Sequence, residues 1–255
     1  MKSKAHSKQK PEKKRLDVLL VERGLAETRQ KAQGLILAGQ VLVDQQKVTK
    51  AGALVVRDAG IEISGRRLRY ASRGGLKLEG ALEDFHVSAS DKVCLDAGSS
   101  TGGFTDCLLQ HGARRVYAVD VTVNQLAWKL QQDQRVILVE RNARELGPDD
   151  LGEAVDLVTI DLSFISVSKV LRAVAAVAKP GAEFLILVKP QFELERGEIA
   201  KGGIVRDPQL HQRAVERVKA AAVETGLLVE AVRPSRLPGA EGNLEFFLHA
   251  RRGAK

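Results

Sequence analysis

Charged and amide side chains stand at the ends of apolar runs in this chain, where buried strands would stop. In an open parallel sheet, ligands bind beyond the carboxyl ends of the strands, so these residues are the first candidates for chemistry. Lys189 directly follows the apolar run 184–188, and a cation there costs free energy unless a carboxylate faces it. Asp161 ends the neighbouring run and is the expected partner, with a structural ion pair at the sheet rim as the alternative. The other strand-end residues are Asp96, Asp120 and Asn142.

Residues 93–105 (VCLDAGSSTGGFT) have the pattern of a strand, a tight glycine-rich loop and a helix start. Such a loop suits a nucleoside, because glycine lets the backbone approach closely and the helix start offers unpaired N–H groups. Asp120 ends the next apolar run, where Rossmann-type folds place a carboxylate on ribose hydroxyls. A dinucleotide site would show Gly-x-Gly-x-x-Gly, whereas this order resembles the S-adenosylmethionine (SAM) loop of class I methyltransferases. The alternative is an ordinary tight turn.

Strand-like and helix-like runs alternate over residues 77–250. This order predicts an α/β, Rossmann-like domain with a seven-stranded, mostly parallel sheet covered on both faces. A helix is expected over 76–85, another over 164–178, and a long one beginning at Asp207-Pro208, which supply an N-cap and a first-turn proline. The expected strands end near residues 96, 120, 138, 161, 188, 229 and 248.

Composition divides the chain into a basic part and a nearly neutral part. The net charge is +8, but residues 1–75 hold 17 Lys or Arg and only 7 acidic residues, while residues 76–255 are slightly acidic. A local basic module suggests binding to a polyanion such as nucleic acid, since Lys and Arg neutralise phosphates. With 255 residues and 44% hydrophobic side chains, the chain can bury one large core and a second small one.

Other function classes find little support in the residues. Cys94 and Cys107 are expected to be inert core thiols in a reducing cytosol. The five histidines are scattered, so no metal is predicted. No signal sequence is recognisable and no apolar run approaches the length of a membrane span, so we expect a cytoplasmic protein without a membrane partner.

The first 62 residues read as a basic tail and a small folded module. Residues 1–14 have almost no apolar side chains and are expected to be disordered. Leu16, Leu19 and Leu20 share a helical face, Thr28 is the expected cap of a second helix, and short strands follow over 41–63.

The segments RLD (15–17), RQKA (29–32) and ILAGQVLVD (36–44) make residues 15–62 similar to the S4 RNA-binding domain. This resemblance implies that Arg29 and Lys31 approach the RNA backbone. Residues 63–76 are rich in Arg and Gly and are expected to form a linker that also touches RNA. The candidate RNA-binding residues are Arg15, Arg29, Lys31, Arg66, Arg67 and Arg73.

The residues that come after the fourth strand limit which atom could accept a methyl group. Methyltransferases that act on base amino groups usually have Asn/Asp-Pro-Pro-aromatic there, whereas this chain has DLSF at 161–164. Attack by pyrimidine C5 needs a nucleophilic cysteine, and neither cysteine is suitably placed. That leaves oxygen. A ribose 2′-hydroxyl needs alignment with the sulfonium methyl and a base, which a lysine can be when burial or a second cation lowers its pKa.

Six segments together resemble the signature blocks of the TlyA (haemolysin A) family. They are SRGGLKL (72–78), DAGSSTGGFT (96–105), DLSFIS (161–166), KPQFE (189–193), KGGIVRD (201–207) and GNLEF (242–246). The domain that carries them is similar to the FtsJ/RrmJ ribose methyltransferases, and the S4-like module precedes it. The resemblance implies SAM-dependent 2′-O-methylation of cytidine in 16S or 23S ribosomal RNA, with ribosomal subunits as partners.

The same resemblance assigns roles to single residues. The family's Lys-Asp-Lys-Glu tetrad maps onto Lys77, Asp161, Lys189 and Glu245, with Lys189 as the base or hydroxyl-positioning group and Asp161 orienting it. Lys77 alone would be read as a surface lysine. Asn142 replaces the acid of FtsJ, so a hydrogen bond to adenine is kept but the charge is lost. The candidate cofactor-binding residues are Asp96, Gly98, Ser100, Gly102, Gly103, Phe104, Asp120, Asn142 and Asp161.

Two other function classes stay open at this point. An RNA-binding ribosome-assembly factor with a vestigial SAM site would keep the fold, although the intact tetrad argues against it. A pore-forming haemolysin would need a spanning helix or a series of alternating amphipathic strands, and the sequence has neither.

Overall fold

The structure is a computed structural model that describes residues 12–23, 25, 26, 28–63, 69–199, 202–239 and 242–254. The chain divides into two compact units, residues 1–67 and 68–255, and each is described by itself. Most of the predicted disordered tail and two candidate RNA-binding residues, Arg66 and Arg67, lie outside the described residues.

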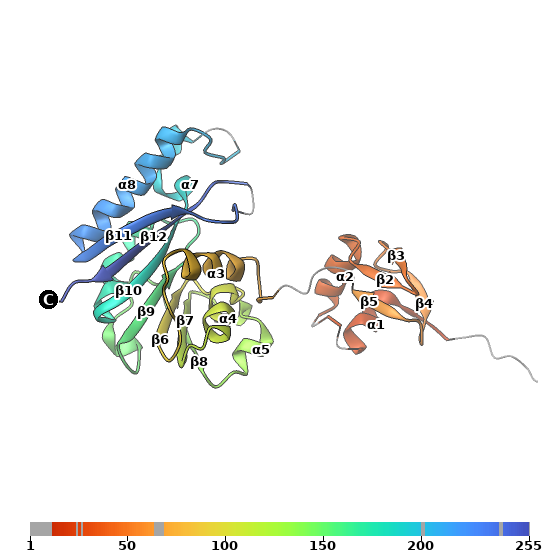
Figure 1. Cartoon of the computed structure of the whole chain (residues 1–255). Helices are drawn as coiled ribbons and strands as arrows, with labels where there is room; N and C mark the ends of the chain where they lie inside the picture. The colour runs from red at the N-terminus through yellow and green to blue at the C-terminus, as the bar shows by residue number, and fades with distance from the viewer. Residues whose placement is uncertain are drawn as a thin grey trace, which may run out of the picture. The chain divides into compact units, whose positions relative to one another are not determined.

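The amino-terminal unit packs two helices against short strands (Figure 1). Leu16, Leu20 and Ile36 are fully buried in its core. The hydroxyl of Thr28 accepts a hydrogen bond from the backbone N–H of Lys31, which confirms the predicted helix cap. The elements are β1 (Lys13–Arg15), α1 (Leu16–Glu22), α2 (Arg29–Leu37), β2 (Val41–Val43), β3 (Gln46–Val48), β4 (Leu54–Val56) and β5 (Ile61–Ile63).

The end of the predicted disordered tail is ordered. β1 pairs antiparallel with β4, in a register that sets Lys13 opposite Val56 and Lys14 opposite Val55. The expectation of disorder is therefore wrong for these two lysines, because backbone hydrogen bonds to a neighbouring strand hold them without any apolar side chain. β2 pairs antiparallel with both β3 and β5 in a separate small sheet.

The carboxy-terminal unit is built on a seven-stranded sheet with the order β11-β12-β10-β9-β6-β7-β8 (Figure 1). Only β12 runs antiparallel to its neighbours, so the predicted fold class is confirmed. The strands are β6 (Val93–Ala97), β7 (Arg115–Asp120), β8 (Val136–Glu140), β9 (Val155–Ile160), β10 (Ala178–Val188), β11 (Leu227–Pro234) and β12 (Phe246–Arg252). The helices are α3 (Gly74–Asp84), α4 (Gly103–Gln110), α5 (Trp128–Gln131), α6 (Leu171–Ala176), α7 (Pro190–Glu193) and α8 (Pro208–Glu224), with short 3₁₀ turns between them.

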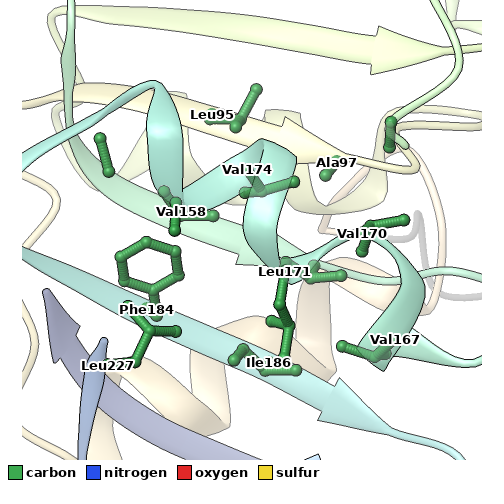
Figure 2. Close-up of a cluster of buried hydrophobic side chains, with 14 of the residues drawn as sticks. Leu95, Ala97, Val158, Val167, Val170, Leu171, Val174, Phe184, Ile186 and Leu227 are labelled. Carbon is green, nitrogen blue, oxygen red and sulfur yellow. The ribbon is translucent and has the colours of Figure 1, made fainter. Parts of the chain in front are cut away.

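Successive strand residues point to opposite faces of this sheet and build two separate cores. One core, with α6 and α8, includes Leu95 and Val158; the other, with α3 and α4, includes Cys94 and Leu157. Figure 2 shows Leu171 and Val174 of α6 lying over side chains of the sheet in the first core. Because both faces are covered, open space for a ligand is left at the carboxyl ends of the strands.

The helix expected over 164–178 is wrong over most of its length. Phe164 has a left-handed backbone (φ +67°), a 3₁₀ turn η3 (Val167–Lys169) follows, and α6 holds only residues 171–176. Ser166 ends the extended segment and accepts from the N–H of Ser168, a local cap that starts the 3₁₀ turn instead of a long helix. At the other end, Ala178 already belongs to β10.

The linker expected over 63–76 is also shorter than predicted at its carboxyl end. Tyr70 is only 1% exposed and packs in the core of the carboxy-terminal unit, and α3 begins at Gly74. A Cβ on Gly75 would overlap the Tyr70 ring, so this glycine serves close packing and not linker flexibility.

Both cysteines are free and buried, as predicted. Burial raises the pKa of Cys94 and of Cys107 to about 12, which keeps both as unreactive thiols. Within the described ranges, the chain contains no helix that is both long and apolar enough to span a membrane.

Candidate active site

The loop after β6 approaches the end of β9 very closely. Gly98 has φ +90°, and a Cβ on it would lie 2.5 Å from the carbonyl oxygen of Asp161. The N–H groups of Gly98 and Ser99 both donate to the carbonyl of Val119, and the N–H of Asp161 donates to that of Ala97. Only glycine satisfies both the backbone angle and the spacing, so this residue brings the ends of β6, β7 and β9 together.

The two glycines that start α4 have different neighbours. Gly102 has φ +91°, and its α-carbon packs against Leu126 and Leu130. Gly103 faces the start of α3, where a Cβ would overlap the hydroxyl of Ser72 and lie 3.0 Å from the N–H of Gly75. Gly103 therefore lets the α4 amino terminus sit directly beside α3.

Asp96 does not point into the ligand space, contrary to its expected role as a direct cofactor contact. It is fully buried and accepts a hydrogen bond from the Thr105 hydroxyl at 2.6 Å, with the Thr159 hydroxyl at 3.4 Å. Burial raises its pKa to about 7. Asp96 thus connects α4 to the sheet through its hydrogen bonds, and it positions the glycine loop without lining the cavity.

Asp120 and Asn142 line an outer cavity along the ends of β7 and β8. The Asp120 carboxylate accepts from the N–H of Ser100 at 2.9 Å and from that of Thr122 at 3.2 Å. Each carboxylate oxygen keeps a lone pair for a further donor. The amide oxygen of Asn142 accepts from the N–H of Arg144 at 3.1 Å.

An inner cavity lies beside the glycine loop and shares Gly98, Ser100, Asp161 and Ser163 with the outer one. The two cavities are therefore halves of one cleft. The inner half is lined by Ser72, Arg73, Gly74, Lys77, Gly98, Ser99, Ser100, Thr101, Gly103, Phe104, Asp161, Ser163, Lys189 and Pro238.

The four residues of the predicted tetrad form two ion pairs at this cleft. Lys189 Nζ lies 2.6 Å from Asp161 Oδ1, a close charge contact without hydrogen-bond alignment, and donates to the Ser163 hydroxyl at 3.0 Å. Lys77 Nζ donates to the Glu245 carboxylate at 2.5 Å. Glu245 is 2% exposed, so Lys77 covers it while itself lining the inner cavity. The structure thus brings together a residue of α3 and the residues that directly follow β9, follow β10 and precede β12.

The predicted cofactor residues fall into two groups. Those that line the cleft are Gly98, Ser100, Gly103, Phe104, Asp120, Asn142 and Asp161. Asp96 and Gly102 support the loop from behind. Phe104 is 3% exposed and stacks on Phe247 with 6.1 Å between ring centroids, so its ring forms the wall of the cavity.

In the amino-terminal unit, two of the predicted RNA-binding arginines share one buried carboxylate. Arg15 contacts Asp17 with two hydrogen bonds of 3.0 and 2.9 Å, and Arg29 Nε donates to the same carboxylate at 2.9 Å. Hydrogen bonding from Arg15 holds the pKa of Asp17 well below its usual range. Both guanidinium groups stay about half exposed, and Lys31 is exposed on α2. Arg73 belongs to the other unit, where it lines the inner cavity.

Among the cleft residues that were given no role from the sequence are Ser163 and Phe164. Ser163 contacts Lys189, and Phe164 is 92% exposed with its ring 5.4 Å from that of Phe192. Both lie in the segment DLSFIS, but the expectation of a helix from residue 164 hid their orientation. A phenylalanine in the sequence does not indicate a left-handed backbone, so the conformation of Phe164 could not be predicted.

Comparison with known proteins agrees with this architecture. The family model for FtsJ-like methyltransferase matches residues 70–252, and that for the S4 domain matches residues 14–60. The 16S/23S rRNA (cytidine-2′-O)-methyltransferase TlyA of Mycobacterium tuberculosis is 46% identical over 93% of this chain and 89% of its own length. This chain belongs to the TlyA family of FtsJ-like methyltransferases.

Other relatives of this TlyA-family chain carry a different name. Hemolysin A of Brachyspira hyodysenteriae is 40% identical over 92% of the chain and 98% of its own length. A solved structure of a candidate hemolysin from Streptococcus thermophilus has a TM-score of 0.74 at 42% identity and covers 95% of this chain and 89% of its own. An S-adenosylmethionine-dependent methyltransferase from Mesorhizobium loti shares the fold of the larger domain, with a TM-score of 0.52 at 17% identity over 68% of this chain and 96% of its own.

No group of three or more His, Cys, Asp or Glu side chains in the described part of this TlyA-family chain is arranged to hold a metal ion. The donors that line the cleft are instead backbone N–H groups, hydroxyls, carboxylates and lysines. Such a set suits an organic ligand with hydroxyl and amino groups.

The burial of Asp96 predicts a pH-dependent stability. Its pKa rises from 3.8 to about 7, so between these values the folded chain keeps a proton that the unfolded chain has lost. As the pH rises from about 4 to about 7, the free energy of unfolding of the wild type should fall by about 2–4 kcal/mol relative to Asp96→Asn. Urea unfolding at several pH values measures this difference. A difference that does not change with pH would contradict it.

Proposed function

We propose that this protein transfers a methyl group from SAM to the ribose 2′-hydroxyl of a cytidine in 16S or 23S ribosomal RNA. The observation that carries the proposal is the meeting of the Lys189–Asp161 and Lys77–Glu245 pairs beside a glycine loop suited to a nucleoside. The cytidine 2′-hydroxyl is the acceptor stated in the name of the Mycobacterium tuberculosis relative. An rRNA substrate would place the activity in the cytoplasm.

The residues that line the cleft suit SAM in their donors and acceptors. Gly98 and Gly103 line the cleft and carry no side chain, so only their backbone borders the ligand space. Asp120 is suited to the ribose hydroxyls and Asn142 to the adenine edge, both in the outer half of the cleft. When bound, SAM supplies a methyl group made electrophilic by its sulfonium charge.

The residues of the inner half are suited to hold the acceptor ribose. Asp161 and Ser163 both contact the Lys189 amine, which fixes its position next to the glycine loop. We assign to Lys189 the alignment of the 2′-hydroxyl and, with its amine in the neutral form and oriented by Asp161, the uptake of the hydroxyl proton on Nζ. Lys77, fixed by Glu245, adds a second cation that favours negative charge developing on the ribose oxygen.

The rest of the RNA would contact two other parts of the protein. The guanidinium groups of Arg15 and Arg29 are oriented by their hydrogen bonds to Asp17, are about half exposed and are suited to phosphate oxygens. In the larger unit, the exposed ring of Phe164 stands at the end of the cleft and offers a flat apolar face on which a base can stack.

Labelled SAM tests the proposed function directly. We expect purified protein to transfer label to ribosomal RNA in isolated subunits, and nuclease digestion to recover the label in 2′-O-methylcytidine. Retention of RNA without label would support the assembly-factor alternative. Dye release from lipid vesicles, without label in RNA, would support the activity that the name Hemolysin A implies.

Replacing Lys189 tests the assigned chemistry. Lys189→Ala should lower the methylation rate by roughly 10²-fold or more, because alignment and proton uptake are both removed, while SAM binding changes little. Lys179→Ala is the matched control, since Lys179 pairs with Asp156 at the opposite end of the sheet. Single-turnover rates and calorimetric SAM affinities give the comparison. Near-normal turnover of Lys189→Ala would remove this residue from the mechanism.

The salt dependence of RNA binding tests the role of the amino-terminal unit. Removing one contact to an RNA phosphate should reduce the slope of log K against log salt concentration by roughly 0.7–0.9. We therefore expect a smaller slope in the double variant Arg29→Gln/Lys31→Gln than in the wild type. Arg57→Gln, on an exposed residue paired with Glu12, is the control. An equal slope in all three proteins would mean that α2 does not contact RNA phosphates.

A further inference from the structure

The two loops that supply the Lys189–Asp161 pair are joined a second time. One loop runs from Asp161, after β9, to the 3₁₀ turn at Val167; the other begins at Lys189, after β10, and forms α7. At its far end the Glu193 carboxylate accepts hydrogen bonds from the Ser166 hydroxyl at 2.5 Å and from the N–H of Val167 at 2.8 Å. The catalytic pair and this second contact thus connect the same two segments.

Glu193 is held in a place that is unfavourable for a carboxylate. It is 2% exposed, and burial raises its pKa even though both hydrogen bonds favour its charged form. Its backbone carbonyl accepts from the Arg217 guanidinium of α8, so α7 is fixed to a long helix. In the described part of the chain, this carboxylate has two neutral donors and no cation hydrogen-bonded to it, and a buried carboxylate of that kind is a costly way to stabilise a fold.

In the loop that Glu193 holds, Leu162 and Ile165 pack against the core of the sheet, whereas the two residues between them do not. Ser163 and Phe164 are exposed, and Phe164 adopts the left-handed conformation, which is strained for a residue that carries a side chain. The amino end of the 161–167 loop is fixed by the hydrogen bond from the N–H of Asp161 to the carbonyl of Ala97. Its carboxyl end is fixed at Ser166 and Val167 by Glu193. Ser163 lies between these anchors and contacts Lys189 from this strained segment.

We propose that Glu193 is a positioning residue for the methyl transfer. Its carboxylate holds the 161–167 loop so that Asp161 and Ser163 keep the Lys189 amine aimed at the acceptor, and so that Phe164 stays at the end of the cleft. The inference rests on the proposed function, because it concerns the geometry of the same site. Glu193 lines neither the inner nor the outer half of the cleft but a separate cavity beside Phe164 and Phe192, so its effect on the site passes through the loop.

Three variants and a matched control separate positioning from general stability. Glu193→Ala removes both hydrogen bonds, and Glu193→Gln keeps an acceptor for the Val167 N–H. Ser166→Ala removes the hydroxyl donor to Glu193 together with the acceptor that caps the 3₁₀ turn. Asp156→Asn is the control: this carboxylate accepts from the N–H of Val93 at 3.0 Å and pairs with Lys179, at the other end of β9.

Single-turnover methylation, RNA KM, SAM affinity and thermal unfolding are measured for each protein. We expect Glu193→Ala to lower kcat by about 10- to 100-fold, as for a displacement of about 1 Å in a catalytic group, with SAM affinity within about twofold of the wild type. Ser166→Ala and Glu193→Gln should fall between Glu193→Ala and the wild type. Asp156→Asn should lose thermal stability but keep kcat.

Hydrogen exchange supplies a readout that does not depend on activity. The Val167 amide should lose protection in folded Glu193→Ala and keep it in Asp156→Asn. A normal kcat in Glu193→Ala, or equal kcat losses in Glu193→Ala and Asp156→Asn at equal stability, would overturn the positioning role. If the wild type itself transfers no label, the proposed function fails; a working wild type with an equally fast Glu193→Ala removes only Glu193.

Discussion

The architecture of the site depends on the charge of Lys189 at the end of a buried strand. β10 is apolar over five consecutive residues before it reaches this lysine, and a cation emerging from such a strand must be met by a carboxylate. Asp161 meets it from the adjacent strand, and Ser163 supplies a hydrogen-bond acceptor. Because an apolar pair could stabilise this position at least as well, the ion pair is better explained by chemistry than by stability.

A second constraint is the distance between backbones at the carboxyl ends of the strands. Gly98 lets the first loop touch the end of β9, and Gly103 lets α4 touch the start of α3. These approaches bring Lys77, on α3, to the same cavity as Asp161 and Lys189. Asp96, buried beneath the loop and bonded to Thr105, keeps α4 in register with β6. Four distant segments can therefore share one cleft without a long connecting loop.

Much of this could be predicted from the sequence, because apolar runs mark buried strands and their end residues mark the ligand side of the sheet. The Lys189–Asp161 contact followed from that rule alone, whereas Lys77 and Glu245 needed the family resemblance. The sequence does not tell whether a side chain at the end of a strand faces the core or the cleft. Asp96 faces the core, while Asp120 faces the cleft. The prediction of a helix over 164–178 was wrong because it rested on apolar periodicity, which carries no information about a local cap at Ser166 or a left-handed backbone at Phe164.

The segment over which the expected helix is wrong also carries residues of the proposed site. Local preferences and the native structure disagree most where the chain holds Ser163 and Phe164, and such disagreements are expected at functional sites, with compensation elsewhere. Here the described residues show the compensation: Glu193, fixed through α7 to α8, bonds the loop just beyond its strained residue. A loop without that contact could relax toward the helix that its sequence favours. The buried carboxylate thus accounts for both the irregular backbone and the geometry of the lysine that the backbone supports.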